Sequence, residues 1–402
     1  MREVVIVDAV RTPVGRYKGS LKDVRPDDLG AIVIKTLIER NPNLTPDQIE
    51  EVVLGNANQA GEDNRNVARM SSLIAGLPVE VGGTTVNRLC GSGLDAAMYG
   101  ARAIAVGEGD VFIAGGTESM TRAPLVMAKP EKDFPRGTME LQDTTIGWRF
   151  VNPTIDRLYG TESMPRTAEN IAKRYKISRE EQDEFSFQSQ QNAKKAIEEK
   201  RFTEEIVPVT YKDKKGNNIV VDADEHPRPD TTREKLSKLR PIFENGTVTA
   251  GNASGINDGA SALLMMSAEK AKELNLKPIA KYLTGATAGL DPSVMGLGPI
   301  YASKKALGRV GLSVSDLGIT EINEAFASQS IECIRQLDLD YGKVNVNGGA
   351  IALGHPLGAS GARILTTLIH EMKRRNEKYG LATMCIGVGQ GIAVIVENME
   401  DC

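Results

Sequence analysis

The feature that most limits the fold of this chain is the alternation of short apolar runs with segments of helical periodicity. Residues 4–10 form an apolar run fit for a buried strand, and residues 26–40 have helical periodicity with a proline at their start. Thr45-Pro-Asp-Gln48 is typical of a capping box that opens a helix, and residues 51–54 supply the next strand. This alternation predicts an α/β layered fold.

Glycine-rich turns punctuate the alternation and occur in similar pairs. Cys90-Gly-Ser-Gly93 precedes the helical pattern of residues 94–106, and Gly358-Ala-Ser-Gly361 precedes another helical segment. Phe112-Ile-Ala-Gly-Gly116 has a counterpart in Met384-Cys-Ile-Gly387. A duplicated α/β core would explain the pairs. Glycine turns before helices are common in α/β proteins, however, so the pattern alone leaves duplication open.

The length of the chain and the changes in composition along it indicate several compact units. A chain of 402 residues exceeds the usual size of a single core. Charged, proline-containing sequence fills residues 121–246, where we expect a helix capped by Ser178-Arg-Glu-Glu181 and a hairpin around Gly216-Asn217. We therefore expect an N-terminal half at residues 1–120 plus 247–273, an inserted loop domain at 121–246 and a C-terminal half at 274–402.

Composition excludes several classes of function. A formal net charge of −4 argues against nucleic acid as a partner, because neutralising phosphates requires a basic surface. No apolar run approaches the ~20 residues of a membrane span, and the N-terminus lacks a cleavable signal, so we expect no membrane partner and a cytoplasmic protein. Four cysteines at scattered positions form no close ligand pair, so we expect no metal site and no disulfide framework.

Cys90 is the first candidate catalytic residue. It lies between a predicted strand and the N-terminus of a predicted helix, where free N–H groups and the helix dipole favour a thiolate that is nucleophilic near neutral pH. Gly91 and Gly93 allow backbone amides to approach a reacting carbonyl and hold an oxyanion. The alternative is a cysteine that serves only as a small buried apolar side chain.

His355 and Cys385 are the other two candidates. His355 lies between Gly354 and Pro356 in a stretch with five glycines, which favours a role as base or oxyanion donor over a structural hydrogen bond. Cys385 opens another glycine-rich strand end, Cys385-Ile-Gly-Val-Gly-Gln-Gly391. A thiol with the reference pKa of ~8.5 would suit proton exchange at a carbon next to a thioester.

Together these motifs resemble the thiolase family over essentially the whole chain. The motifs that carry the resemblance are Asn87-Arg-Leu-Cys-Gly-Ser-Gly93, Gly246-Thr-Val-Thr-Ala-Gly-Asn-Ala-Ser-Gly255, Asn323-Glu-Ala-Phe-Ala327, Gly354-His-Pro-Leu-Gly358 and Cys385-Ile-Gly-Val-Gly-Gln-Gly391. The resemblance implies a five-layered α/β/α/β/α fold of two similar halves with an inserted loop domain. It also implies a homotetramer built as a dimer of dimers, with coenzyme A and acyl-CoA thioesters as substrates and no bound cofactor.

The resemblance also assigns roles to single residues. It implies Cys90 as the acylated nucleophile, His355 as the group that activates it, Cys385 as the acid/base and Asn323 as the residue that positions a water. It implies two oxyanion holes. The backbone N–H groups of Cys90 and Gly387 form one of them, and His355 and the water form the other. The positions matched to CoA or acyl binding are Arg228, Ser254, Ala250, Met164, Ala325 and Phe326.

Two other functions compete with that of a thiolase. A ketoacyl synthase would need a second active-site histidine, and neither His226 nor His370 lies in a suitable turn. That function would also leave Cys385 without a role. A noncatalytic CoA-binding protein on the same fold would be expected to lack a reactive residue, and this chain lacks none of the matched ones.

The substrate is less constrained by the sequence. Residues 143–153, Leu158-Tyr-Gly-Thr-Glu-Ser-Met-Pro165 and Asp222-Ala-Asp-Glu-His226 resemble the 3-oxoadipyl-CoA thiolases of aromatic-acid catabolism. Short-chain biosynthetic thiolases often carry histidine where this chain has Ser163, and the serine argues against a dedicated acetoacetyl-CoA enzyme. A general 3-oxoacyl-CoA or acetoacetyl-CoA thiolase stays the alternative, and the direction, thiolysis or Claisen condensation, stays open. A distal carboxylate would need a cationic partner, for which Arg149 and Arg166 are the candidates.

Overall fold

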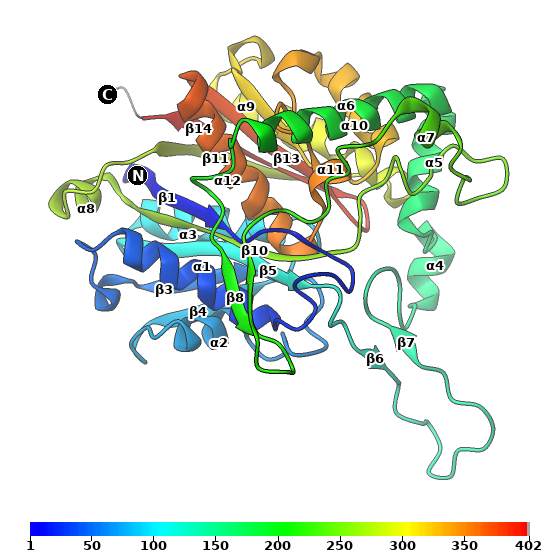
Figure 1. Cartoon of the computed structure of the whole chain (residues 1–402), viewed down its shortest axis with the longest axis horizontal. Coiled ribbons are helices and arrows are strands. Elements are labelled where there is room, and N and C mark those ends of the chain that lie inside the picture. Colours follow the sequence, from blue (N-terminus) through cyan, green and yellow to red (C-terminus); the bar gives the residue numbers. More distant parts are fainter. Residues whose placement is uncertain (400–402) are drawn as a thin grey trace.

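Ten strands of the described residues join in one mixed sheet that is bent into two stacked halves, and two further strand pairs stand apart from it (Figure 1). The computed structural model describes residues 1–399. The first half of the sheet contains β1 (Val4–Arg11), β3 (Glu51–Gly55), β4 (Gly82–Val86), β5 (Val111–Ser119) and β10 (Asn257–Ser267). The second half contains β11 (Ala280–Gly289), β12 (Ile319–Ile322), β13 (Tyr379–Ile386) and β14 (Gln390–Asn398). A short antiparallel pairing of β1 with β11 connects them.

The two halves share one strand order. The first half runs β4-β3-β5-β10-β1, and the second runs β12-β13-β14-β11, with a bridge at Val344 in the place of β4. β3 and β12 are parallel to their neighbours β5 and β13, whereas β10 and β14 are antiparallel to theirs. The paired glycine turns therefore do come from two similar halves, and β5 and β13 are equivalent strands.

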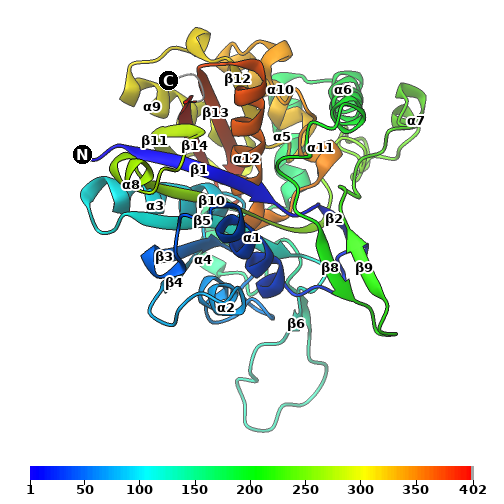
Figure 2. The ribbon, with the colours of Figure 1, turned by 60° about the vertical axis from the view of Figure 1, so that its left-hand side comes forward.

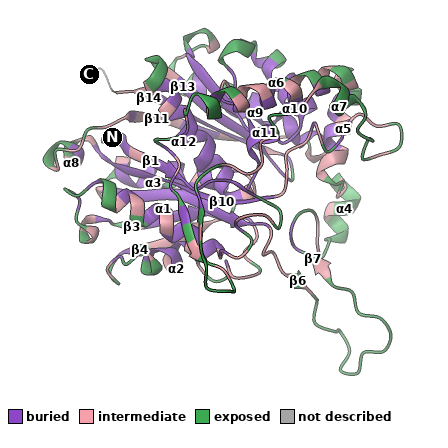
Figure 3. Cartoon of the chain, in the orientation of Figure 1, coloured by how far each residue is buried: buried purple, intermediate pink, exposed green. Residues whose placement is uncertain are grey.

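Helices complete a five-layered arrangement. The outer layers are α1 (Pro26–Arg40) and α2 (Val67–Ile74) on the first half, and α9 (Gly298–Val310) and α10 (Ala327–Leu337) on the second. The central layer is α3 (Ser92–Val106) and α12 (Leu357–Arg375), which contact each other and both halves of the sheet. Figure 3 shows this centre as the most buried part of the molecule. The expected α/β/α/β/α fold is confirmed.

Glycines allow the two central helices to meet at their N-termini. A Cβ atom at Gly93 would lie 2.6 Å from the backbone nitrogen of Ala362, and one at Gly361 would overlap the backbone nitrogen of Leu94. Contacts this close exclude any side chain at either position. The turn of Cys90 and the turn of His355, which precede these helices, are therefore held at the same end of the central layer.

A long excursion separates β5 from β10. It contains β6 (Leu125–Val126), β7 (Gln142–Asp143), α4 (Pro153–Tyr159), α5 (Met164–Tyr175), α6 (Arg179–Glu198), β8 (Val209–Lys212), β9 (Asn218–Val221) and α7 (Arg233–Ser237). The expected cap is present, since Ser178 Oγ accepts a hydrogen bond from the N–H of Glu181, and β8 and β9 form the expected hairpin. The domain boundaries given above remain our proposal.

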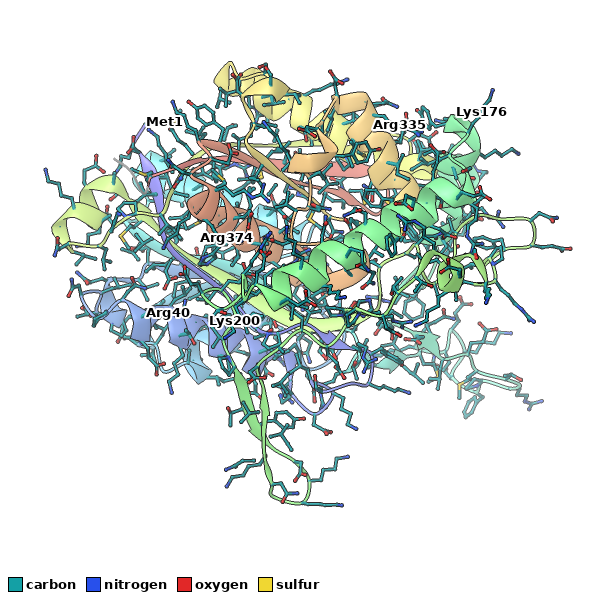
Figure 4. All side chains as sticks on the ribbon, turned by 45° about the horizontal axis from the view of Figure 1, so that its top comes forward. Met1, Arg40, Lys176, Lys200, Arg335 and Arg374 are labelled. Atoms are coloured by element: carbon teal, nitrogen blue, oxygen red, sulfur yellow. The ribbon has the colours of Figure 1, made fainter. Side chains whose placement is uncertain are left out.

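Several smaller features complete the fold. The remaining short elements are α8 (Ala268–Glu273), α11 (Ala350–Leu353) and β2 (Gly15–Arg16), which pairs with β10 as the tenth strand of the large sheet. The helix expected after Thr45 is wrong: the capping box opens only a 3-10 turn at Pro46–Gln48, because Ile49 is already extended towards β3. Arg201 and Arg374 both donate to Asn347 Oδ1, so α6 and α12 end close together, near the labelled Lys200 and Arg374 in Figure 4.

Two further properties concern residues 1–399. None of the helices there has the length and apolar character needed to cross a membrane. That part of the chain also holds no group of three or more His, Cys, Asp or Glu side chains arranged to bind a metal ion. Figure 2 shows two hairpins that project from the layered body, β8–β9 and the longer arm between β6 and β7.

Candidate active site

Cys90 lies in a strained turn between β4 and α3. Leu89, the residue before it, has a φ of +47°, in the left-handed region that branched residues rarely adopt. Two side chains hold this conformation: Asn87 Oδ1 accepts the N–H of Leu89 at 2.9 Å, and Ser92 Oγ accepts the N–H of Arg88 at 2.9 Å. Backbone strain of this kind persists where surrounding contacts fix it, commonly at functional sites.

The thiol of Cys90 is protonated at neutral pH. Burial raises its pKa to about 11, although the backbone N–H groups of Gly387 and of Cys90 itself act in the opposite direction. The sequence-based expectation of a thiolate near neutral pH is therefore wrong. The helix N-terminus is where it was expected, but desolvation of the sulfur outweighs its effect. The same two N–H groups face the sulfur, as an oxyanion hole at this site requires.

Cys385 is the second thiol of the site. It lies near the end of β13, is buried, and pairs with Gly391 of β14. Burial raises its pKa well above that of an ordinary thiol, and the proximity of Cys90 raises it further. The expectation of an ordinary thiol pKa is wrong for this reason. Because burial and the nearby Cys90 both disfavour its ionisation, Cys385 keeps its proton and can act as a proton donor in the resting protein.

His355 is fixed by three contacts. It follows Gly354, whose φ of +101° requires glycine. Its backbone N–H donates to Asn257 Oδ1 at 2.9 Å, its Nδ1 lies 2.6 Å from Ser360 Oγ, and its Nε2 lies 3.5 Å from Asn323 Nδ2. Ser360 Oγ donates its own hydrogen to the carbonyl of Pro356, so it accepts from Nδ1. The lone pair of His355 is therefore on Nε2, towards Asn323.

His355 is neutral in the folded protein. Burial lowers its pKa to about 3, and the positive charge of the buried Arg363 adds to the effect. A neutral imidazole can accept a proton from a thiol, which a histidinium cannot.

Asn323 directly follows β12 and is fully buried. Its backbone N–H donates to the carbonyl of Thr383 in β13, so the residue is fixed next to the strand that carries Cys385. Its side-chain Oδ1 has no hydrogen-bond partner among the described residues. A buried amide oxygen without a partner is suited to a bound water or substrate group.

Four of the residues expected to bind substrate gather around Cys385. Met164, Ala325 and Phe326 belong to one apolar cluster with Cys385, and Ser254 donates its backbone N–H to the carbonyl of Ala325 at 2.9 Å. The other two lie apart. Ala250 and Arg228 are exposed, and the side chain of neither has a recorded contact with this cluster.

Several residues that shape the site could not be recognised from the sequence. Asn257 and Ser360 hold His355, and Arg363 acts on it electrostatically. Glu118 accepts from the backbone N–H groups of Ala57 and Gly358, each at 2.8 Å, and so ties the loop after β3 to the start of α12. Burial raises the pKa of Glu118 to about 7. Most of these contacts join residues far apart in the chain.

Comparison with known proteins agrees with this geometry. Residues 4–269 match the family described as "Thiolase, N-terminal domain", and residues 276–398 match "Thiolase, C-terminal domain". The 3-oxoadipyl-CoA/3-oxo-5,6-dehydrosuberyl-CoA thiolase of Escherichia coli (strain K12) is 56% identical over 402 residues, covering 99% of this chain and 100% of the relative. The beta-ketoadipyl-CoA thiolase of Pseudomonas knackmussii is 57% identical over 403 residues, covering 99% and 100%.

Solved structures give the same result. The crystal structure of human mitochondrial 3-ketoacyl-CoA thiolase in complex with CoA is similar with a TM-score of 0.92 and 42% identity, covering 99% of this chain and 98% of that one. The Bacillus anthracis acetyl-CoA acetyltransferase is similar with a TM-score of 0.91 and 42% identity, covering 99% of both. On its sequence, its fold and the arrangement of its two thiols and histidine, this chain belongs to the thiolase family.

Proposed function

We propose that this thiolase cleaves 3-oxoadipyl-CoA with coenzyme A to give acetyl-CoA and succinyl-CoA, and catalyses the reverse condensation. The observation that carries the proposal is the pair of neighbouring thiols, the half-buried Cys90 and the buried Cys385, at the end of the molecule that also holds a neutral His355. Relatives named for beta-ketoadipyl-CoA or 3-oxoadipyl-CoA are 54–57% identical, whereas an acetyl-CoA acetyltransferase from Thiocystis violacea is 47% identical. The subclass rests on that difference.

The first half of the reaction acylates Cys90. Nε2 of His355 accepts the thiol proton as Sγ attacks the C3 carbonyl of the substrate. Because the Cys90 thiol and the His355 imidazole are both neutral at rest, a thiolate and an imidazolium form only when the substrate carbonyl is bound. The N–H groups of Cys90 and Gly387 stabilise one developing oxyanion, and His355 with a water held by Asn323 stabilises the other. The bond between C2 and C3 then breaks.

Cys385 completes the first half and begins the second. Its thiol gives a proton to C2 of the enolate, and the product leaves as acetyl-CoA. The resulting Cys385 thiolate then takes the proton of the incoming CoA thiol. CoA then attacks the acyl group on Cys90, and His355 returns its proton to the released Cys90 sulfur. Each proton that leaves a group is replaced, so proton transfer and one covalent bond account for the chemistry without a bound cofactor.

Coenzyme A is the proposed partner of the cluster around Cys385. Met164, Ala325 and Phe326 offer an apolar surface for pantetheine, to which Ser254 is bonded through the carbonyl of Ala325. Ala250, which is exposed and outside this cluster, would contact CoA at the protein surface. Arg228 is exposed and forms no ion pair with any other residue in 1–399, so its guanidinium is free to contact the nucleotide phosphates. Of the other histidines, His370 lies 2.9 Å from the carbonyl of Ala9, and His226 lies 3.2 Å from Nδ2 of Asn257, whose Oδ1 holds the backbone of His355.

Assembly as a cytoplasmic homotetramer is also proposed. The arm between β6 and β7 projects from the body in Figure 1 and carries exposed apolar side chains, namely Leu125, Met127, Phe134, Met139 and Leu141. Apolar side chains on an extension without a core of its own indicate a protein interface.

A competition assay tests the proposed substrate. Thiolysis is followed with acetoacetyl-CoA, a medium-chain 3-oxoacyl-CoA and 3-oxoadipyl-CoA at equal concentrations. The proposal expects the highest kcat/KM for 3-oxoadipyl-CoA. A higher kcat/KM for either of the others would instead support a general or short-chain thiolase.

A further inference from the structure

A substrate with a distal carboxylate leaves a succinyl group on Cys90, and that carboxylate must be accommodated close to the sulfur. It lies two methylene groups beyond the thioester carbonyl. Burying a carboxylate without a partner is costly, so a cation or several donors should face it. This step rests on the proposed function. A positive group is therefore expected on the acyl side of Cys90.

The loop at residues 143–150 contacts two segments of the chain that lie on different sides of the Cys90 turn. On one side, Arg149 Nη2 donates to the carbonyl of Asn58 at 3.3 Å. On the other, Trp148 Nε1 donates to the carbonyl of Glu162 at 3.3 Å, just before Met164. The loop therefore connects two segments of the chain that are distant in sequence.

Both of these segments contact the site directly. On the first, Asn87 of the Cys90 turn donates to the carbonyl of Ala57, the neighbour of Asn58, at 3.1 Å. On the second, a Cβ atom at Gly387 would lie 3.7 Å from Met164 Sδ and 3.2 Å from Leu89 Cδ1. Arg149 therefore donates to the residue next to Ala57, which the turn of Cys90 contacts.

The guanidinium of Arg149 is available to a ligand. It is half-buried, and its one recorded hydrogen bond is to the carbonyl of Asn58. Among residues 1–399 it forms no ion pair. A half-buried arginine normally has a carboxylate partner or several acceptors, and a guanidinium can bind one carboxylate through two parallel hydrogen bonds.

Arg166 occupies a different place. Its guanidinium stacks on the ring of Phe243 at 3.8 Å from the centroid. Phe243 belongs to the turn that continues to Val248, which packs with Phe326 and Cys385. Arg166 therefore lies on the side proposed for pantetheine, a part of the substrate that is the same whatever the acyl chain.

We propose that Arg149 binds the distal carboxylate of the acyl group and selects 3-oxoadipyl-CoA, and that Arg166 has no part in this selection. The specificity of the enzyme then depends on the loop at residues 143–150 rather than on α5. Arg166 provides a matched control, since it is another half-buried arginine without a carboxylate partner among the described residues.

The test compares 3-oxoadipyl-CoA with 3-oxohexanoyl-CoA, which has the same chain length and a methyl group in place of the carboxylate. Arg149→Met should lower kcat/KM for 3-oxoadipyl-CoA by about tenfold or more and leave 3-oxohexanoyl-CoA nearly unchanged, as loss of a charge-assisted hydrogen bond predicts. Arg149→Lys should fall between, because it keeps the charge and loses the paired donors. Arg166→Met should affect both substrates equally.

The outcomes separate the two proposals. A wild-type enzyme with equal kcat/KM for both substrates overturns the substrate proposal and the role of Arg149 with it. A wild-type preference for 3-oxoadipyl-CoA that survives Arg149→Met overturns the role of Arg149 alone. Equal losses on both substrates for Arg149→Met, together with a lower melting temperature, would show that Arg149 only holds its loop to Asn58.

Discussion

The protonation states of single residues determine how this site begins its reaction. Burial places the pKa of Cys90 at about 11 and that of His355 at about 3, so both groups are neutral at pH 7. A cysteine at a helix N-terminus is visible in a sequence. The burial that reverses its expected pKa is not visible there, because it depends on segments such as the Gly387 turn that lie far along the chain.

The neutral state of Cys90 can be measured by alkylation. Below its pKa of about 11 the thiolate fraction rises tenfold for each pH unit, so the rate of Cys90 modification by iodoacetamide should rise about tenfold per unit between pH 7 and 9. Peptide mapping identifies the modified residue, and the Cys90→Ala variant gives the background. A rate independent of pH over this range would indicate a thiolate already formed, as in a thiolate–imidazolium pair.

Ser360 should control the basicity of His355 through the tautomer. In Ser360→Ala, Nδ1 loses its acceptor at 2.6 Å, and the tautomer with the hydrogen on Nε2 becomes competitive. Acylation of Cys90 by acetyl-CoA, followed by rapid quench and intact mass, should slow by about tenfold to a hundredfold, a part of what a general base contributes. Ser186→Ala, which removes a buried serine bonded within α6, is the control and should acylate at the wild-type rate. Equal rates for the two variants would contradict the role of Ser360.

At the scale of elements, much of the fold was predictable and the contacts between elements were not. The strand and helix alternation, the cap at Ser178 and the β8–β9 hairpin follow from local sequence patterns. The motifs also located Cys90, His355, Cys385 and Asn323. The support from Asn257 could not be predicted, because it joins residues 98 positions apart. The helix expected after Thr45 is wrong for a related reason, since the chain becomes extended at Ile49 to enter β3.

The contact between α3 and α12 should depend on glycine. In Gly93→Ala the added Cβ would lie 2.6 Å from the nitrogen of Ala362, and overpacking of this kind typically costs about 1–3 kcal/mol. The melting temperature should therefore fall. Gly308→Ala is the control, because a Cβ at that exposed position of α9 meets no atom within 4 Å and alanine favours a helix. An unchanged melting temperature for Gly93→Ala would show that the central helices do not need this approach.

At the scale of the whole molecule, the arm between β6 and β7 is the feature that a single chain does not explain. Phe134 near its tip is 87% exposed, so the arm gains little from burial within its own subunit (Figure 3). The same segment leads into the loop of Arg149. The proposed interface and the proposed carboxylate site therefore lie in neighbouring parts of the excursion between β5 and β10.

Shortening the arm should change assembly. Replacing residues 129–140 by a short glycine linker removes Phe134 and Met139, and the mass measured by light scattering after size exclusion should fall from that of a tetramer to that of a dimer. Shortening the β8–β9 hairpin at residues 213–217 is the control and should leave the mass unchanged. A tetramer that persists without the arm would place the interface elsewhere.

The proposed mechanism requires that Cys90 carries the acyl group of a substrate with a distal carboxylate. The most direct measurement is rapid-quench mass spectrometry of the enzyme mixed with 3-oxoadipyl-CoA in the absence of CoA. We expect a succinyl group on the peptide that contains Cys90, and no acylation of the folded Cys90→Ala variant. A succinyl group on another residue, or turnover at the wild-type rate in Cys90→Ala, would contradict the mechanism.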